Sequence, residues 1–196
     1  MKIILITHPT RLIGEWNVVL ELFERGLDTL HIRKPGYSEE DIANILNRLP
    51  KDLRPQIVLH GYPEIALKYK LKGLHHNSTT NFIPNFGISQ SKSFHSIKEV
   101  LSCKEPYSYG LISPVFDSIS KLDYLSHFSA DDLKHLNSKT KLPLVALGGI
   151  TSNSIQEVHD MGFKKIAVLG TIWEQIIHER LYMVFDSLRL NSKKFK

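Results

Sequence analysis

Two short aliphatic runs in the last third of the chain each stop at glycine, and this arrangement constrains the fold more than any other feature. The runs occupy 143–149 and 165–170, and a helix-like segment, 151–162, lies between them. Aliphatic and β-branched runs of this length are typical of strands buried on both faces of a parallel sheet. A (β/α)8 barrel closes in this order and forms a phosphate pocket from its last two strand-to-helix loops. Glycine suits such loops because a Cβ would keep a phosphate from the backbone N–H groups.

The alternation of strand and helix runs through the whole chain. Helical patterns separate most of eight strand-like runs, which lie at 3–7, 29–33, 56–60, 72–75, 86–90, 109–113, 144–147 and 165–169. Strict alternation predicts a parallel sheet with right-handed crossovers, and eight repeats favour a closed barrel over an open doubly wound sheet. A chain of 196 residues is short for this architecture. The predicted fold class is therefore α/β, a single (β/α)8 TIM barrel with short loops.

Local signals define several of the helices. Ser38 with Asp41 makes a capping-box-like start for a helix at 39–49. Gly162 follows a helix at 153–161, where a left-handed C-cap residue is expected. We also predict one long helix at 171–188, whereas the polar segment 77–85 is predicted to be a loop or a single turn.

Length and composition limit the domain organisation and the class of partner. The chain is long enough for one core and too short for two ordinary domains, so we assign 1–190 to the barrel and 191–196 to a solvated basic tail. A single cysteine, Cys103, excludes an internal disulfide, and the apolar start is too short for a signal peptide or a membrane span. We expect a cytoplasmic protein. Its net charge of +5 fits small anionic ligands, and neither a nucleic acid nor a membrane is predicted as a partner.

The residues that follow the predicted strands are rich in cations and hydrogen-bond donors, and chemistry in this fold takes place at those strand ends. Arg33 is the sharpest candidate, since a guanidinium binds phosphate oxygens through a planar fork; a salt bridge on the barrel rim is the alternative. Lys34 is a weaker candidate because adjacent strand residues point to opposite sides. Ser118, Ser120 and Lys121 offer two hydroxyls and an ammonium group that suit phosphate contacts, or they form an ordinary polar loop.

Histidines also gather at these strand ends: His8, His31, His60 and His75. Imidazoles could bind a ligand, exchange protons near neutral pH or hold a metal. Each histidine could equally be a packed, hydrogen-bonded residue without a chemical role. We predict no metal ligand among the side chains of the chain.

These motifs, taken in order, resemble the thiamine phosphate synthase family and its relative, the TenI-type thiazole tautomerase. The strand motif at 30–33 is similar to the family's Gln-x-Arg, and Gly73-Leu-His75 to its Gly-Val-His. Ser93-Phe-His95-Ser96 is similar to the Ser-x-His-Ser/Thr that opens the fifth helix, and 113–121 to a Gly-Pro-Val/Ile-Phe/Tyr segment followed by Thr-x-Thr-Lys. The runs at 147–153 and 166–172 match the two phosphate loops.

The resemblance implies a transferase of thiamine biosynthesis that joins hydroxymethylpyrimidine diphosphate to thiazole phosphate, releases pyrophosphate and is assisted by Mg²⁺. Arg33 and Lys121 would stabilise the departing pyrophosphate. His60 would take part in catalysis in place of the family's Asn-Asp pair. The further residues implied to bind substrate are His31, Lys34, His75, Ser93, Ser118, Ser120, Gly148, Gly149, Leu169 and Gly170.

The chain departs from the family pattern at the positions where the family's metal-binding residues stand. The Asn-Asp pair after the third strand is His60-Gly61 here, and a second metal-binding Asp falls at Thr79 or Thr80. We therefore expect Mg²⁺ only through the diphosphate of the substrate. Pro114 stands where the tautomerase carries a histidine. Two other functions stay open: a tautomerase-like isomerisation with His31, His60 or His75 moving protons, and a catalytically silent binder of thiazole or thiamine phosphate. A homodimer is also left open.

Overall fold

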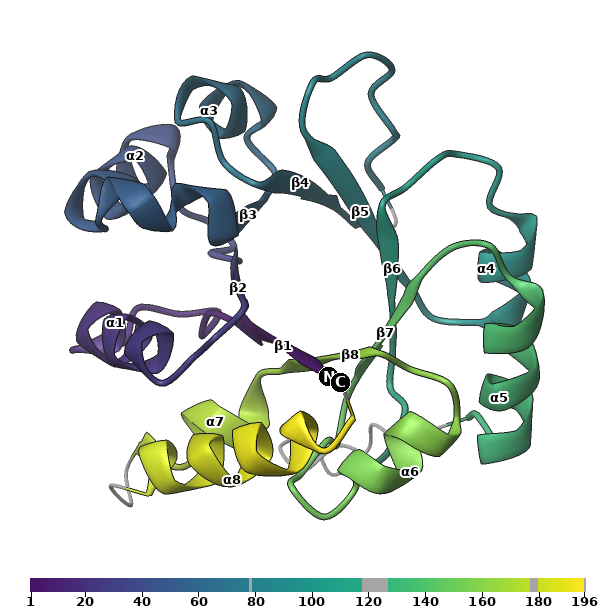
Figure 1. Cartoon of the computed structure of the whole chain (residues 1–196). Helices are drawn as coiled ribbons and strands as arrows, with labels where there is room; N and C mark the ends of the chain where they lie inside the picture. Colours follow the sequence, from purple (N-terminus) through teal and green to yellow (C-terminus); the bar gives the residue numbers. More distant parts are fainter. Residues whose placement is uncertain (78, 118–126, 177–179, 196) are drawn as a thin grey trace.

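The computed structural model describes residues 1–77, 79–117, 127–176 and 180–195. Eight parallel strands pair in chain order from β1 to β8, and β8 pairs with β1, so that the sheet closes. Figure 1 views this barrel along its axis, with the helices in a ring outside the strands. The predicted (β/α)8 barrel is therefore confirmed. The strands are β1 (Lys2–Ile6), β2 (Thr29–Ile32), β3 (Ile57–His60), β4 (Gly73–His76), β5 (Ser89–Phe94), β6 (Tyr109–Ile112), β7 (Leu144–Leu147) and β8 (Lys165–Val168).

The helices cover the outside of the barrel and are short. They are α1 (Glu15–Glu24), α2 (Glu39–Arg48), α3 (Pro63–Lys68), α4 (Ile97–Ser102), α5 (Ala130–Lys139), α6 (Ile155–Asp160), α7 (Gly170–Trp173) and α8 (Leu181–Lys193), with a 3₁₀ helix at Lys51–Gln56. The capping box of α2 is present: the Asp41 N–H donates to the Ser38 hydroxyl, and the Asp41 carboxylate accepts from the Ser38 N–H. Gly162, just after α6, has a φ of 91°, as the C-cap prediction requires.

Two elements differ from the sequence prediction. Strand β5 is Ser89–Phe94, whereas the sequence pattern predicted a strand at 86–90. Its sequence, Ser-Gln-Ser-Lys-Ser-Phe, lacks an aliphatic run because its inward residues pair with polar groups of the barrel interior. The single helix predicted at 171–188 is also wrong, since α7 ends at Trp173 and α8 begins at Leu181.

The hydrophobic core has two parts because strand residues alternate between the two faces of the sheet. Outward residues such as Ile3 and Leu5 pack with Val19 and Leu22 of α1 in the layer between strands and helices. The inward apolar cluster consists of Ile4, Ile6, Tyr109, Leu111, Val145 and Ala167. These residues belong to β1, β6, β7 and β8, so one half of the barrel interior is apolar and the other half is left to β2–β5.

The two ends of the described chain meet at the amino-terminal end of β1 (Figure 1). The terminal ammonium of Met1 donates to the carbonyl oxygens of Ser192 and Phe195, at 2.5 and 2.6 Å. A cation at the last carbonyls of a helix is favourable because those groups lack intrahelical donors. Ser192 is buried. The expected boundary at residue 190 falls inside α8, which ends at Lys193, and the side chains of Lys193 and Lys194 are exposed. Among the described helices, none combines the length and apolarity needed to cross a bilayer.

Candidate functional site

The half of the barrel interior formed by β2–β5 is polar and carries three of the predicted histidines. His60 of β3 and His75 of β4 are register partners, and His75 is the partner of Ser91 on β5. His31 lies on β2, next to β3. His31 and His75 are buried, whereas His60 is half-buried. Inward positions on adjacent strands therefore bring the three imidazoles together.

Hydrogen bonds fix the orientation of these rings. His31 Nδ1 lies 3.0 Å from His60 Nε2, and His31 Nε2 lies 2.7 Å from the hydroxyl of Tyr109. The two ring nitrogens of His75 each lie 2.8 Å from a serine hydroxyl, Nδ1 from Ser91 and Nε2 from Ser93. The rings of His60 and His75 are 4.2 Å apart between centroids. We call His31, His60 and His75 the histidine cluster.

The histidine cluster is neutral at physiological pH. Burial lowers the pKa of His31 and of His60 well below the usual range, and the neighbouring His75 lowers both further. Burial, with smaller contributions from His76 and Arg33, lowers the pKa of His75 to about 3. An imidazolium without surrounding water is disfavoured, and a second cation nearby disfavours it more. Each ring therefore has one N–H donor and one nitrogen lone pair.

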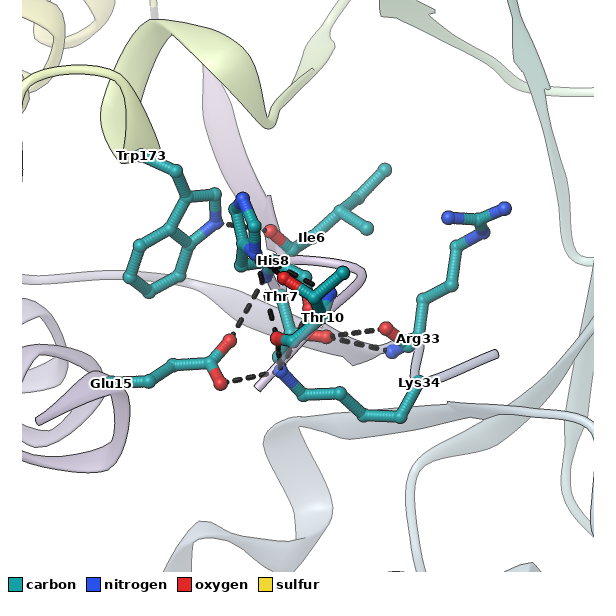
Figure 2. A network of polar contacts seen from close by, with 8 residues as sticks. All are labelled: Ile6, Thr7, His8, Thr10, Glu15, Arg33, Lys34 and Trp173. Atoms are coloured by element: carbon teal, nitrogen blue, oxygen red, sulfur yellow. Dashed lines mark hydrogen bonds and ion pairs between the residues drawn. The ribbon is translucent and has the colours of Figure 1, made fainter. Parts of the chain in front are cut away.

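Arg33 lies beside the histidine cluster at the mouth of the barrel. Its main chain is held by Thr7, whose hydroxyl accepts from the Arg33 N–H at 2.8 Å and donates to the Arg33 carbonyl at 3.0 Å (Figure 2). The side chain is exposed, and no ion pair holds it within the part of the chain that the structure describes. A cavity of about 400 Å³ opens here; it is lined by Arg33, Lys34, Pro35, Gly36, His60, Gly61, Tyr62, His75, Asn77 and Thr80. A cation is thus available to an anion in this cavity.

The Lys34 ammonium lies on the other side of the strand end. It forms a buried ion pair with Glu15 of α1 and donates to the carbonyl oxygens of His8 and Thr10, at 2.7 and 3.0 Å. Figure 2 shows Arg33 and Lys34 pointing in different directions from adjacent positions. Burial raises the pKa of Glu15, and the hydrogen bond and charge of Lys34 oppose that shift. Lys34 lines the cavity beside Arg33, but Glu15 pairs with its ammonium group. Substrate binding by Lys34 stays a prediction.

The glycine-containing loops after β7 and β8 lie at the same end of the barrel. Gly148 and Gly149 have φ values of 102° and 62°. A Cβ would lie 2.8 Å from Pro114 Cα at Gly148 and 2.3 Å from the Asp117 carbonyl oxygen at Gly149. Close packing against the loop after β6 thus requires both glycines, whether or not a phosphate approaches them.

The second of these loops leads directly into a helix. Gly170 is the first residue of α7, and the carbonyl of Leu169 accepts from Ile172 and Trp173, both at 3.1 Å. Thr171 joins the two loops by donating to the Ile150 carbonyl at 2.6 Å. The first N–H groups of a helix have no intrahelical acceptor, which makes this position suitable for a phosphate.

Several of the predicted site residues lie together and others do not. Arg33, His60 and His75 line one cavity, and His31 lies behind them. Ser93 contacts His75, so it holds a cluster residue in place. Ser118, Ser120 and Lys121 lie outside the described residues. The contacts of Ser91 with His75 and of Tyr109 with His31 were not predicted. The alternation of serines at 89, 91 and 93 was a signal for the first, but nothing in the sequence pointed to Tyr109.

Comparisons of sequence and of structure with known proteins both identify thiamine phosphate synthases as relatives of this chain. A family model described as thiamine monophosphate synthase matches residues 3–172, from β1 to α7. A thiamine-phosphate synthase from Shouchella clausii is 25% identical over 175 residues, which cover 84% of this chain and 83% of the relative. The crystal structure of thiamine phosphate pyrophosphorylase from Bacteroides thetaiotaomicron superposes with a TM-score of 0.86 at 28% identity, over 100% of both chains. A thiamine phosphate pyrophosphorylase from Pyrococcus furiosus, 22% identical with a TM-score of 0.81 over 98% of this chain and 96% of its own, has the same fold.

Proposed function

Because the chain belongs to the thiamine monophosphate synthase family, we propose that it is a transferase that couples hydroxymethylpyrimidine diphosphate with thiazole phosphate and releases pyrophosphate. The exposed guanidinium of Arg33 beside a cavity of about 400 Å³ is the observation that carries this proposal. A diphosphate that leaves gains negative charge on its oxygens, and a cation beside those oxygens lowers the energy of that step. Arg33 is the described residue that supplies such a cation at this cavity.

The other parts of the site receive roles that fit their chemistry. The backbone N–H groups near Gly149, Leu169 and Gly170 bind the thiazole phosphate, since the start of α7 leaves amides without intrahelical partners. His60 faces the cavity as a neutral imidazole and contributes a hydrogen bond to the substrate. Lys121, Ser118 and Ser120 are proposed to contact the diphosphate on sequence grounds alone.

The described residues at the cavity do not fit a magnesium site made by the protein. Mg²⁺ prefers oxygen ligands, with one or two carboxylates, whereas no Asp or Glu is among the described residues that line this cavity. His60 and Gly61 occupy the place of the family's Asn-Asp pair. Any Mg²⁺ that accompanies the reaction would be bound by the diphosphate oxygens of the substrate.

The test is an assay of pyrophosphate release with both substrates present and each one omitted in turn. The proposal expects release, and formation of thiamine phosphate in equal amount, only when both substrates are present. Binding of thiamine phosphate without turnover would favour the silent binder instead. Isomerisation of a thiazole phosphate in the absence of the pyrimidine substrate would favour the tautomerase alternative.

A further inference from the structure

The proposed coupling reaction uses the histidine cluster only through His60, and the geometry of the three rings together points to a further role. His31, His60 and His75 come from three adjacent strands, and one ring nitrogen of each lies within 4.8 Å of those of the other two. His31 Nδ1 and His60 Nε2 are 3.0 Å apart. A tetrahedral Zn²⁺ with bonds of about 2.0–2.1 Å holds two nitrogen ligands roughly 3.4 Å apart. Small rotations of the three side chains would therefore place three nitrogens around one ion.

His31 and His75 have the hydrogen-bond partners that usually orient metal-binding histidines. A histidine that binds a metal through one nitrogen usually donates its other N–H to an oxygen, which fixes the ring. With Nδ1 of His31 on a metal, Nε2 donates to the Tyr109 hydroxyl, 2.7 Å away. His75 has a serine hydroxyl at each nitrogen, so the nitrogen that does not bind the ion can donate to Ser91 or Ser93.

The cluster also leaves a coordination position open. His60 and His75 line the cavity of about 400 Å³, whereas His31 lies behind them. Three histidines with a fourth position open to a cavity is a donor set found in catalytic zinc sites. Imidazole nitrogens suit Zn²⁺ and other late divalent metals, whereas Mg²⁺ and Ca²⁺ need oxygen ligands.

We propose that His31, His60 and His75 bind one divalent transition metal ion, of which Zn²⁺ is the type, at the mouth of the barrel. The ion is held by three imidazole nitrogens, and its fourth position faces the cavity beside Arg33. The site does not depend on the proposed coupling activity. Pyrophosphate release by a zinc-free protein would not contradict the metal site. Zinc binding without turnover would contradict the proposed coupling activity but not the metal site.

A zinc titration of the full chain tests the site. The protein is first freed of metal by a chelator and is then titrated with Zn²⁺ in competition with a chromophoric chelator. We expect one Zn²⁺ per chain, not displaced by millimolar Mg²⁺, and a Co²⁺ derivative with the intense visible bands of a four-coordinate ion. His31→Gln, His60→Gln and His75→Gln should each weaken Zn²⁺ binding by at least about 100-fold, above the 10–100-fold range of outer partners. Tyr109→Phe should weaken it by about 10-fold. His8→Gln, a histidine at the same mouth outside the cluster, should leave it unchanged.

A second variant keeps the test decisive if a glutamine variant does not fold. His60→Cys should still bind Co²⁺ and should add a thiolate-to-metal charge-transfer band that the unmodified chain lacks. Two results would overturn the proposal. One is Zn²⁺ binding that the cluster substitutions do not weaken, which means surface binding only. The other is a His60→Cys protein that binds Co²⁺ without the new band.

Discussion

Lys34 and Glu15 form a buried ion pair that ties the end of β2 to the start of α1, directly beneath the mouth of the barrel. Both side chains are almost fully excluded from water, at 1% and 2% exposure. The pair also holds the loop after β1, because Lys34 binds the carbonyl oxygens of His8 and Thr10 while Glu15 accepts from the His8 N–H at 2.9 Å. Adjacent residues of one strand end thus differ in their surroundings: Lys34 holds the loop after β1, and Arg33 lines the cavity.

Removing the carboxylate of this pair should be costly. Glu15→Ala leaves the Lys34 ammonium buried without a counter-charge, and we expect a loss of about 3–5 kcal/mol in the free energy of unfolding. Urea denaturation measures it. The control is Glu21→Ala, which breaks the partly exposed pair between Glu21 and Arg25 and should cost less than about 1 kcal/mol. Equal losses in the two variants would contradict the structural role of Lys34.

Arg33→Ala should lower the turnover of pyrophosphate release by roughly 100-fold, the size of effect seen when one group that stabilises developing charge is removed. The fold should be unchanged, because the side chain is exposed and Thr7 binds only its main chain. Steady-state kinetics and a thermal melt check the two parts. Arg48→Ala, at the end of α2 on the outside of the barrel, is the matched control. Turnover that is as high with Arg33→Ala as with Arg48→Ala would remove Arg33 from the site.

Gly149→Ala should destabilise the protein by about 2–5 kcal/mol, because a positive φ and a clash act together. The new Cβ would lie 2.3 Å from the carbonyl oxygen of Asp117, at a φ of 62°. Gly14→Ala isolates the first effect, since Gly14 has a φ of 77° and a Cβ added there would meet nothing within 4 Å; we expect it to cost only about 1–2 kcal/mol. Thermal and urea unfolding give both values, and similar losses would argue against close packing of the two loops.

Stability should fall with acidity in the metal-free protein. The folded pKa of His75 is about 3, below its unfolded value of about 6.5. The unfolded chain therefore binds more protons between these two values, and stability is full above pH 6.5 and is lost as the pH falls toward 3. One such group gives a slope of up to about 1.4 kcal/mol per pH unit, and the lowered pKa values of His31 and His60 act in the same direction.

Chemical denaturation across this pH range, with a chelator present, measures the slope. His75→Gln should flatten it, because the substituted side chain has no proton to gain on unfolding. An unchanged slope in that variant would mean that other groups cause the loss.

The sequence predicted the parts of the fold that depend on local pattern. Strand β7 was predicted at its observed bounds, Leu144–Leu147. A short aliphatic run that proline precedes and glycine follows is typical of a buried strand. Strand β5 was misplaced because Gln90 and Ser91 are buried against histidines and backbone rather than in an apolar layer, and the half-buried Ser93 also contacts a histidine. The hydrophobicity of the strand's own residues does not show which polar groups from other strands will lie beside them.

The candidate site was predictable to the extent that it follows strand ends. Arg33, His60 and His75 were named from that rule alone, and they share one cavity. The contact between His31 and Tyr109 joins residues 78 positions apart in the chain. The pairing of Lys34 with Glu15 depends on how α1 packs beside β2. The His31–Tyr109 contact and the Lys34–Glu15 pair both depend on tertiary packing in the barrel. Neither can be predicted from a local stretch of sequence.

The barrel interior is divided into an apolar half, where the sheet closes, and a polar half, which carries the candidate site. The seam between β8 and β1 closes beside the apolar cluster of Ile4, Ile6, Tyr109, Leu111, Val145 and Ala167. The residues that line the candidate site lie on or just after β2, β3 and β4. We therefore expect substitutions of the inward polar residues of β2–β5 to leave the closing strand pair, β8 and β1, intact. Selection on the candidate site and selection for barrel closure would then act on different strands.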